Sequence, residues 1–193
     1  MICLRQVSAG YPEKEVLKGL NLSLPEKGAV AVMAPSGYGK TTLLRVLAGL
    51  LPIQDGELTG LKDQKVSFLF QEDRLLPWLT AEKNVEIVSS PEKARFWLHE
   101  MEIEEMNQYP QAMSGGMQRR VALARAMAFG GDVLLLDEPF KGLDGALRAR
   151  IASRIRGVFP LTVLSVHDQE EAALLGATII HLDQEKEERA WQR

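Results

Sequence analysis

The chain has 193 residues, of which 46% are hydrophobic and 25% charged, and its formal net charge is −3 at pH 7. This composition is that of a soluble globular protein of one domain. The negative charge argues against a general nucleic-acid binder, which is normally basic. The only cysteine, Cys3, excludes an internal disulfide, so we expect a reducing compartment.

The first part of the chain predicts an antiparallel β layer followed by a strand and a helix. Residues 2–8 and 16–24 alternate apolar and polar side chains, as half-buried strands do. The apolar run 29–33 predicts a buried strand, and the spacing of leucines over 41–50 predicts a helix. Residues 52–60 have the composition of a turn region.

The middle of the chain is predicted to be mainly helical. Residues 65–70 form a short apolar strand, after which Thr80 is suited to cap a short helix that runs through Val88. A second helix is expected over 91–106 and a long third one from Ser114 to the two glycines that begin at Gly130.

The last part alternates strands with helices. Strands are expected over 133–136, 161–166 and 177–182, with helices over 145–158 and 169–175 between them. This alternation predicts an α/β fold with a mainly parallel sheet flanked by helices. The charged tail, 183–193, is expected to fray.

The segment APSGYGKT, residues 34–41, fits the phosphate-binding pattern G-x-x-x-x-G-K-[ST] except at its first position. Gly37 and Gly39 allow the backbone to direct several N–H groups at one anion. Lys40 then supplies a charge for the phosphates, and Thr41 a hydroxyl for Mg²⁺. The predicted strand and helix on either side weigh against the alternative, an ordinary glycine turn.

Alanine replaces the first glycine of this pattern, at Ala34. An alanine is harmless there if its φ angle is negative, whereas it costs about 1 kcal/mol or more if the loop requires a positive φ. The sequence leaves both possibilities open, and we expect binding to survive.

Polar residues follow several of the predicted parallel strands. Gln71, the pair Asp137 and Glu138, and His167 each come directly after an apolar run, as the phosphate loop does. Ligands of such sheets bind beyond the carboxyl ends of the strands. Beside the loop, Asp137 is suited to help hold Mg²⁺ and Glu138 to orient or deprotonate a water. Without the loop, a helix cap and a solvated charge would be the better interpretation of this pair.

The motifs resemble those of the ATP-binding subunits of ABC transporters, and the resemblance covers nearly the whole chain. MSGGMQRRVALARAM, residues 113–127, resembles the signature sequence of that family, and VLLLDEPF resembles its Walker B strand. GLD, ending at Asp144, resembles the D-loop. Gln71 is placed like the Q-loop glutamine and His167 like the switch histidine.

The resemblance implies ATP and Mg²⁺ as cofactors and a P-loop NTPase core. It implies ATP contacts at Tyr11, Pro35, Ser36, Gly37, Tyr38, Gly39, Lys40, Thr41, Thr42, Ser114, Gly115, Gly116 and Asp144. It implies Mg²⁺ contacts at Thr41, Gln71 and Asp137, and catalytic roles for Glu138, His167, Gln71 and Lys40. Tyr11 would stack on adenine. Two copies would form a homodimer that holds two ATP molecules between them, each completed by the partner's signature helix.

The segment FQEDRLLPWLTAEKNV resembles the nitrate, sulfonate and taurine class of bacterial importers. This resemblance implies transmembrane permease subunits, a solute-binding protein and a place on the cytoplasmic face of the membrane. Leu76, Trp78 and Leu79 would contact the permease; the alternative is that they pack within the helical subdomain. The first residues lack the pattern of a signal peptide, and no apolar run reaches membrane-spanning length, so we expect that a partner would have to hold the chain at the membrane.

The expected domain is single, with residues 1–71 and 131–193 forming the core and 72–130 a short helical subdomain. Two other functions stay open: a soluble ABC-type ATPase with a regulatory or nucleic-acid-associated role, and a degenerate ATP-binding scaffold. No nucleic-acid partner is expected, since Arg119, Arg120 and Arg125 are better explained as a solvated or interface face of the signature helix.

Overall fold

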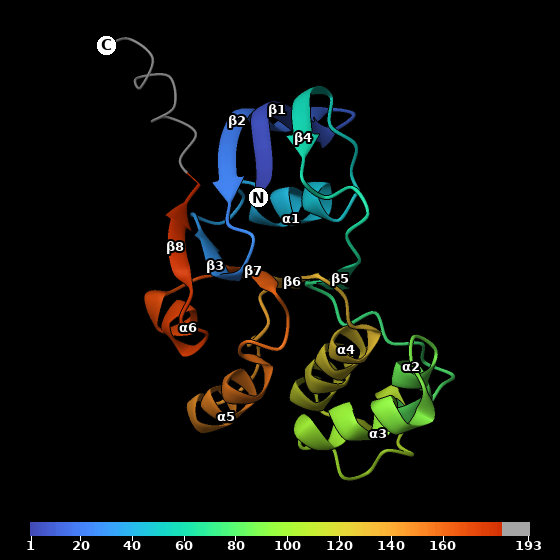
Figure 1. Cartoon of the computed structure of the whole chain (residues 1–193). Coiled ribbons are helices and arrows are strands. Elements are labelled where there is room, and N and C mark those ends of the chain that lie inside the picture. The colour runs from blue at the N-terminus through green and yellow to red at the C-terminus, as the bar shows by residue number, and fades with distance from the viewer. Residues whose placement is uncertain (183–193) are drawn as a thin grey trace.

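The computed structural model describes residues 1–182 and begins with a three-stranded antiparallel sheet. In this sheet β1 (Ile2–Tyr11) lies between β2 (Lys14–Leu24) and β4 (Asp55–Thr59), at the top of Figure 1. The antiparallel layer predicted at the N-terminus is therefore present.

The second sheet has five strands and is parallel throughout. They are β3 (Gly28–Met33), β5 (Val66–Leu69), β6 (Val133–Asp137), β7 (Leu161–Val166) and β8 (Thr178–His181). Their order in the sheet is β5-β6-β7-β3-β8, and every neighbouring pair is parallel. The central strand β7 and its neighbour β6 are buried along their whole length, which explains why most of their residues are apolar.

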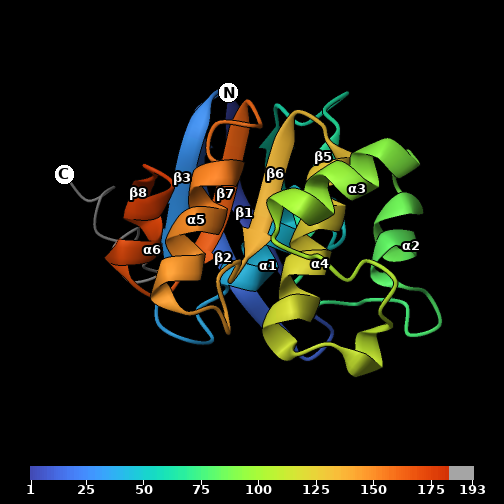
Figure 2. The ribbon, with the colours of Figure 1, turned by 90° about the horizontal axis from the view of Figure 1, so that it is seen from below.

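Helices cover both faces of the parallel sheet. The helix α1 (Lys40–Leu47) lies between the two sheets, and its leucines share one apolar core with residues of both. On the opposite face lie α4 (Gly115–Phe129), α5 (Gly145–Ile155) and α6 (Gln169–Leu174), as Figures 1 and 2 show. This arrangement confirms the predicted α/β fold and brings the carboxyl ends of the strands to one edge of the sheet.

Two short helices, α2 (Ala81–Glu86) and α3 (Pro91–Glu100), pack against α4. Thr80 caps α2 as predicted, because its hydroxyl accepts a hydrogen bond from the backbone N–H of Lys83 at 3.3 Å. A single 3₁₀ turn (Pro110–Ala112) leads into α4. These elements all lie within residues 72–130; that this segment forms a subdomain stays a prediction.

The prediction of a turn region over 52–60 is wrong, since β4 occupies most of it. β4 pairs with β1 through Leu58 opposite Leu4 and Glu57 opposite Arg5. The strand lies at the edge of an exposed sheet and is itself mostly exposed. It therefore lacks the apolar alternation by which strands are found in a sequence.

Several predicted helices end earlier than expected. The helix placed over 91–106 ends at Glu100, and Glu102 has a φ of 55° that no α-helix continues. Even so, Met101 and Ile103, beyond the end of the helix, are buried. The helix placed over 41–50 ends at Leu47, followed by Gly49 at a φ of 68°.

Within residues 1–182, none of the helices combines the length and the apolar character needed to span a bilayer. The tail at 183–193, for which fraying is predicted, lies outside the described residues.

Candidate functional site

The phosphate loop connects β3 to α1 and has the backbone geometry that its glycines predict. Gly37 and Gly39 have φ angles of 82° and 94°, which side chains rarely tolerate. A Cβ atom on Gly39 would also lie 2.9 Å from Cδ2 of Leu17 and 3.1 Å from Cγ1 of Val16. Gly39 is the N-cap of α1 and offers no side chain, so no N-cap side chain occupies the first N–H groups of the helix and they can bind an anion.

Lys40 lies within this loop and is only 8% exposed. Its ammonium donates hydrogen bonds to the backbone oxygens of Ala34 at 2.6 Å and of Pro35 at 3.4 Å. Ala34 is not among the non-glycine residues of positive φ in the described part of the chain. An alanine at the first position of the pattern is therefore unstrained.

One cavity of about 340 Å³ lies against the loop and unites most of the predicted site. The residues that line it come from β1, β2, the phosphate loop, the start of α1 and the positions that follow three parallel strands. They are Tyr11, Lys14, Val16, Ser36, Gly37, Gly39, Lys40, Thr41, Thr42, Gln71, Glu138 and His167.

Asp137 is the last residue of β6 and is 1% exposed. Ser165 lies opposite Asp137 on β7, and its hydroxyl donates a hydrogen bond of 2.6 Å to Oδ1 of Asp137. Its Oδ2 is buried and has no hydrogen-bond partner among the described residues. A buried carboxylate oxygen with one side left open fits a hard cation such as Mg²⁺ or a water in its coordination shell.

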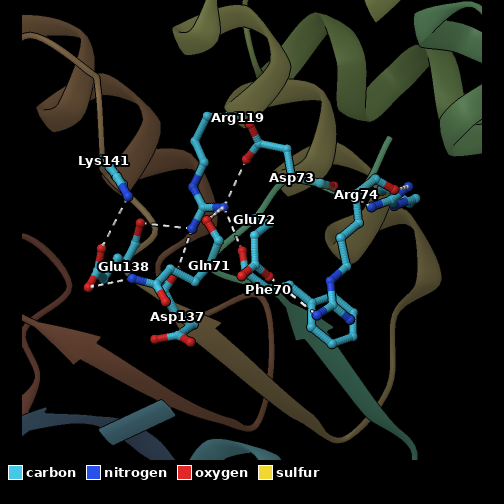
Figure 3. Close-up of polar contacts among 10 residues, drawn as sticks. Phe70, Gln71, Glu72, Asp73, Arg74, Arg119, Asp137, Glu138 and Lys141 are labelled. Atoms are coloured by element: carbon cyan, nitrogen blue, oxygen red, sulfur yellow. Dashed lines mark hydrogen bonds and ion pairs between the residues drawn. The ribbon is translucent and has the colours of Figure 1, made fainter. Parts of the chain in front are cut away.

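Glu138 follows Asp137 in a left-handed conformation, with a φ of 51°. Its Oε1 accepts a hydrogen bond from Nε2 of Gln71 at 3.2 Å and lies 2.9 Å from Nε2 of His167. Lys141 Nζ lies 3.9 Å from the other carboxylate oxygen. Three residues predicted from separate strand ends thus meet at one carboxylate, as Figure 3 shows for Gln71.

The predicted signature residues do not line this cavity. Ser114 caps α4 by accepting a hydrogen bond from the N–H of Met117, and both Ser114 and Gly115 are exposed. A Cβ on Gly115 would meet no atom within 4 Å. Asp144 caps α5 in the same way, accepting a hydrogen bond from Leu147. These residues form a second, open surface of helix N-termini.

Other predicted nucleotide contacts flank the loop. The ring of Tyr11 is 39% exposed, and its hydroxyl accepts a hydrogen bond from Arg45 at 2.7 Å. Tyr38 stands at the tip of the loop and is 45% exposed. Neither Pro35 nor Tyr38 lines the cavity, whereas Thr42 does.

The expectation that the arginines of the signature helix form a solvated or interface face is wrong. Arg119 is 3% exposed, and its guanidinium donates to the backbone oxygens of Phe70 and Glu138 and to the carboxylate of Asp73. Burial lowers the pKa of Arg120 and of Arg125. The guanidinium of Arg120 donates to the backbone oxygens of residues 101 and 102, and that of Arg125 donates to the backbone oxygens of residues 73 and 74.

Sequence reasoning also missed Ser165, which is fully buried in β7. Besides its bond to Asp137, its Oγ accepts a hydrogen bond from the N–H of Glu138 at 3.0 Å. A signal exists in the sequence, because serine interrupts an otherwise apolar run two residues before His167. The parallel register that sets Ser165 beside Asp137 comes only from the structure.

Comparison with known proteins agrees with this geometry. A family model described as ABC transporter matches residues 17–141. A probable sulfate/thiosulfate import ATP-binding protein CysA of Chlorella vulgaris is 35% identical, over 96% of this chain and 88% of its own. The aliphatic sulfonates import ATP-binding protein SsuB 2 of Pseudomonas syringae pv. tomato is 38% identical, and the match covers 91% of this chain and 78% of that protein.

A solved structure gives the same result for the fold. The dimeric structure of the ATP-binding cassette MJ0796, in a post-hydrolysis state bound to ADP and Pi, matches with a TM-score of 0.86. It is 29% identical, and the match covers 95% of each chain. The family model over residues 17–141 and relatives that are more than 30% identical over most of their length show that this chain belongs to the ABC transporter family of ATP-binding proteins.

Proposed function

We propose that this chain is the ATP-binding and ATP-hydrolysing subunit of an importer, and that it powers uptake of a small sulfonate- or sulfate-like anion through separate membrane subunits. The observation that supports the ATPase most strongly is the cavity beside the phosphate loop. Gln71, Glu138 and His167 line this cavity together with Lys40 and the loop glycines, so a phosphate held by the loop would face the Glu138 carboxylate.

The loop amides and Lys40 would bind the phosphate groups of ATP. The backbone N–H groups at the start of α1 provide a positive field, and the ammonium of Lys40 is already desolvated and directed at the loop. Tyr11, at the rim of the cavity, would stack on the adenine. These groups would place positive charge where negative charge develops on the phosphates during phosphoryl transfer. Such electrostatic stabilisation is the main source of catalysis in this reaction class.

Glu138 would act as the general base for water. Its carboxylate would accept the proton of the attacking water while the oxygen of that water bonds to the γ-phosphorus, the bond from the γ-phosphorus to the bridging β–γ oxygen breaks, and ADP leaves with that oxygen. Gln71 and His167 hold Oε1 of this carboxylate and line the same cavity, so they would also orient the water and contact the γ-phosphate.

Mg²⁺ would be held by Thr41 and Asp137, with Gln71 at its coordination shell. No cluster of three His, Cys, Asp or Glu side chains suited to a metal occurs among residues 1–182. This fits Mg²⁺, which proteins usually bind through one or two carboxylates together with the phosphates of a substrate. When bound, the ion would neutralise charge on the phosphates. The hydrogen bond from Ser165 holds Oδ1 of Asp137, and Oδ2, which has no hydrogen-bond partner among the described residues, would be the atom available to the ion or to its water shell.

The surface formed by Ser114, Gly115, Gly116 and Asp144, called the signature surface below, would complete the site of a second copy. Ser114, Gly115 and Gly116 lie at a helix N-terminus with open space above Gly115, and they do not line the cavity of their own chain. A head-to-tail homodimer would place this surface on the γ-phosphate held by the partner, with Asp144 at the contact. The dimeric form of MJ0796 supports this arrangement.

The segment after Gln71 would contact the permease. Trp78 is 68% exposed, whereas Leu76 and Leu79 are half-buried. The two leucines therefore pack partly within the fold and expose only part of their surface. Trp78 is the side chain that could insert into a pocket of the permease. Arg74, in the same segment, also lines an apolar groove of about 420 Å³.

The relatives named as sulfate/thiosulfate and sulfonate import proteins favour import over export. We propose a peripheral location on the cytoplasmic face of a bacterial membrane, with a solute-binding protein in the complete system. A soluble regulatory or nucleic-acid-associated ATPase is less well supported, since Arg119, Arg120 and Arg125 are engaged within the fold. A degenerate scaffold is less well supported because Ala34 is unstrained and Gln71, Glu138 and His167 meet.

The substitution Lys40→Ala tests ATP binding at the loop. Loss of a charge-assisted hydrogen bond to phosphate should weaken binding by about 10- to 100-fold. Affinity is measured by titration with a fluorescent ATP analogue and Mg²⁺. An unchanged affinity would mean that the loop does not bind the phosphates.

A further inference from the structure

Arg119 of α4 joins the segment after Gln71 to the residue that would act as base. We propose that Arg119 is a positioning residue for hydrolysis: it fixes the backbone of Glu138 against that segment and thereby sets where the Glu138 carboxylate lies. This inference rests on the proposed function, because it takes Glu138 as the general base.

The guanidinium of Arg119 is buried between two parts of the chain, as Figure 3 shows. Nη2 donates to the backbone oxygen of Glu138 at 2.8 Å and also to that of Asp137. Nη1 donates to the backbone oxygen of Phe70 at 2.6 Å and to Oδ1 of Asp73 at 2.9 Å. One side chain therefore binds both strand ends, that of β5 and that of β6.

The backbone of Glu138 needs such support. Its φ of 51° lies in a region that non-glycine residues rarely occupy and that persists only where the surroundings determine it. Its N–H donates to Ser165 Oγ at 3.0 Å, and its backbone oxygen accepts from Arg119. The backbone N–H of Glu138 is thus held by β7 and its backbone oxygen by α4.

An arginine suits this position because its guanidinium is a planar fork with donors on separate nitrogens. Nη1 and Nη2 point to different segments here, which the single nitrogen of a lysine could not reproduce. The buried charge is compensated by Asp73, whose carboxylate is partly buried as well.

The same contacts also bear on Gln71. Its backbone lies between Phe70 and Asp73, both held by Arg119, and its side-chain amide donates to Oε1 of Glu138 at 3.2 Å. Arg119 therefore fixes both partners of the Gln71–Glu138 hydrogen bond. Loss of the Arg119 side chain should therefore move the Glu138 carboxylate relative to the cavity while leaving the phosphate loop in place.

Arg125 provides a matched control on the same helix. Its guanidinium donates to the backbone oxygens of Asp73 at 2.7 Å and of Arg74 at 2.9 Å. It anchors the same segment to α4, but among the described residues it makes no hydrogen bond to Glu138. Comparing the two arginines separates anchoring of the segment from positioning of Glu138.

The experiment compares Arg119→Gln and Arg125→Gln in the full chain, by kcat, KM for Mg-ATP and nucleotide affinity. A displaced base should lower kcat of Arg119→Gln by about 10- to 100-fold, since small misplacements of a reacting group are costly. Nucleotide affinity should stay within about twofold, because the phosphate loop is untouched. Arg125→Gln should keep kcat within about threefold of the parent chain.

A double substitution tests whether Arg119 acts through Glu138. In the Glu138→Gln background the base is already absent, so adding Arg119→Gln should lower the residual rate by less than about twofold. A merely structural role would lower the rate in both backgrounds. Equal losses in the two backgrounds, or equal losses for Arg119→Gln and Arg125→Gln, would overturn the inference.

Amide hydrogen exchange gives a readout that does not depend on activity. Exchange of the peptide over 137–140 should become about tenfold faster in Arg119→Gln and not in Arg125→Gln, because the backbone of Glu138 is released. Unchanged exchange of this peptide in Arg119→Gln would overturn the inference. Should Arg119→Gln not fold, Arg119→Lys takes its place in each comparison.

These measurements separate the inference from the proposed function. If Glu138→Gln hydrolyses ATP as fast as the parent chain, Glu138 is not the base and the proposed function fails in that respect. Arg119 would then position no catalytic group, whatever the exchange shows. If Glu138→Gln is slow and the Arg119 variants behave like the parent chain, only the inference fails.

Discussion

Nε2 of His167 lies 2.9 Å from Oε1 of Glu138, so the residues that directly follow β7 and β6 meet through their side chains. The two strands are neighbours in the parallel sheet, with Ser165 opposite Asp137. The contact therefore follows from strand register, and it places the imidazole of His167 against the carboxylate of the proposed base, where both residues line the cavity.

Substitution of His167 by alanine should reduce ATP hydrolysis and preserve ATP binding. Without the imidazole, the Glu138 carboxylate loses one of the two side chains that hold Oε1, and the expected loss in kcat is on the order of 100-fold. His99→Ala is the control, because the side chain of His99 is 83% exposed on α3. Steady-state hydrolysis and nucleotide titration measure the two effects; full activity of His167→Ala would contradict its role.

Glu171 of α6 should make stability depend on pH in a defined direction. Burial, and then the charge of Asp168, raises the pKa of Glu171 above its ordinary value of 4.5, although Arg148 lies 3.4 Å away. The folded state thus holds this proton more tightly than the unfolded state does. The free energy of unfolding should fall as pH rises from 4.5 through the raised pKa.

Glu171→Gln removes this titration. Urea unfolding of both proteins at several pH values should show that the free energy of unfolding of the variant falls less over that window than that of the parent chain. Parallel profiles for the two proteins would show that Glu171 titrates alike in the folded and unfolded states.

Trp78→Asp should disrupt the contact with membrane subunits and spare the ATPase site. A charge at a side chain that is 68% exposed should leave the fold intact but oppose burial in an apolar partner. Co-purification with the proposed membrane subunits is the measurement, and Phe96→Asp, at a residue that is 57% exposed on α3, is the control. Equal recovery of the membrane subunits with both variants would place the contact elsewhere.

The sequence predicted which residues lie together where those residues follow apolar strands. Gln71, Asp137 and Glu138, and His167 each end such a run, and parallel strands bring their carboxyl ends to one edge. The same reasoning missed β4, because an exposed edge strand carries little apolar periodicity.

Residues whose role comes from long-range packing could not be predicted in this way. The arginine at 119 lies among polar residues of the signature helix, and its partners Phe70 and Asp73 are 49 and 46 positions away. The residues around Arg119 do not show that it is buried. Because buried residues lie around most of α4, the helix has no single apolar face from which the burial of one position could be predicted. Ser165 likewise depends on its partner across the sheet.

The central claim is that two copies of this chain enclose ATP between the phosphate loop of one and the signature surface of the other. The molar mass of Glu138→Gln in solution, with and without Mg-ATP, tests it most directly. Removing the base should leave binding intact and prevent hydrolysis, so the closed dimer should accumulate. The Glu138→Gln, Lys40→Ala double variant, which should not hold the phosphates, serves as the control.

The account predicts a monomer whose mass doubles only when Mg-ATP is present, and no doubling in the double variant. A Glu138→Gln protein that binds Mg-ATP and keeps the mass of a monomer would contradict the claim that the signature helix completes the site of a second copy.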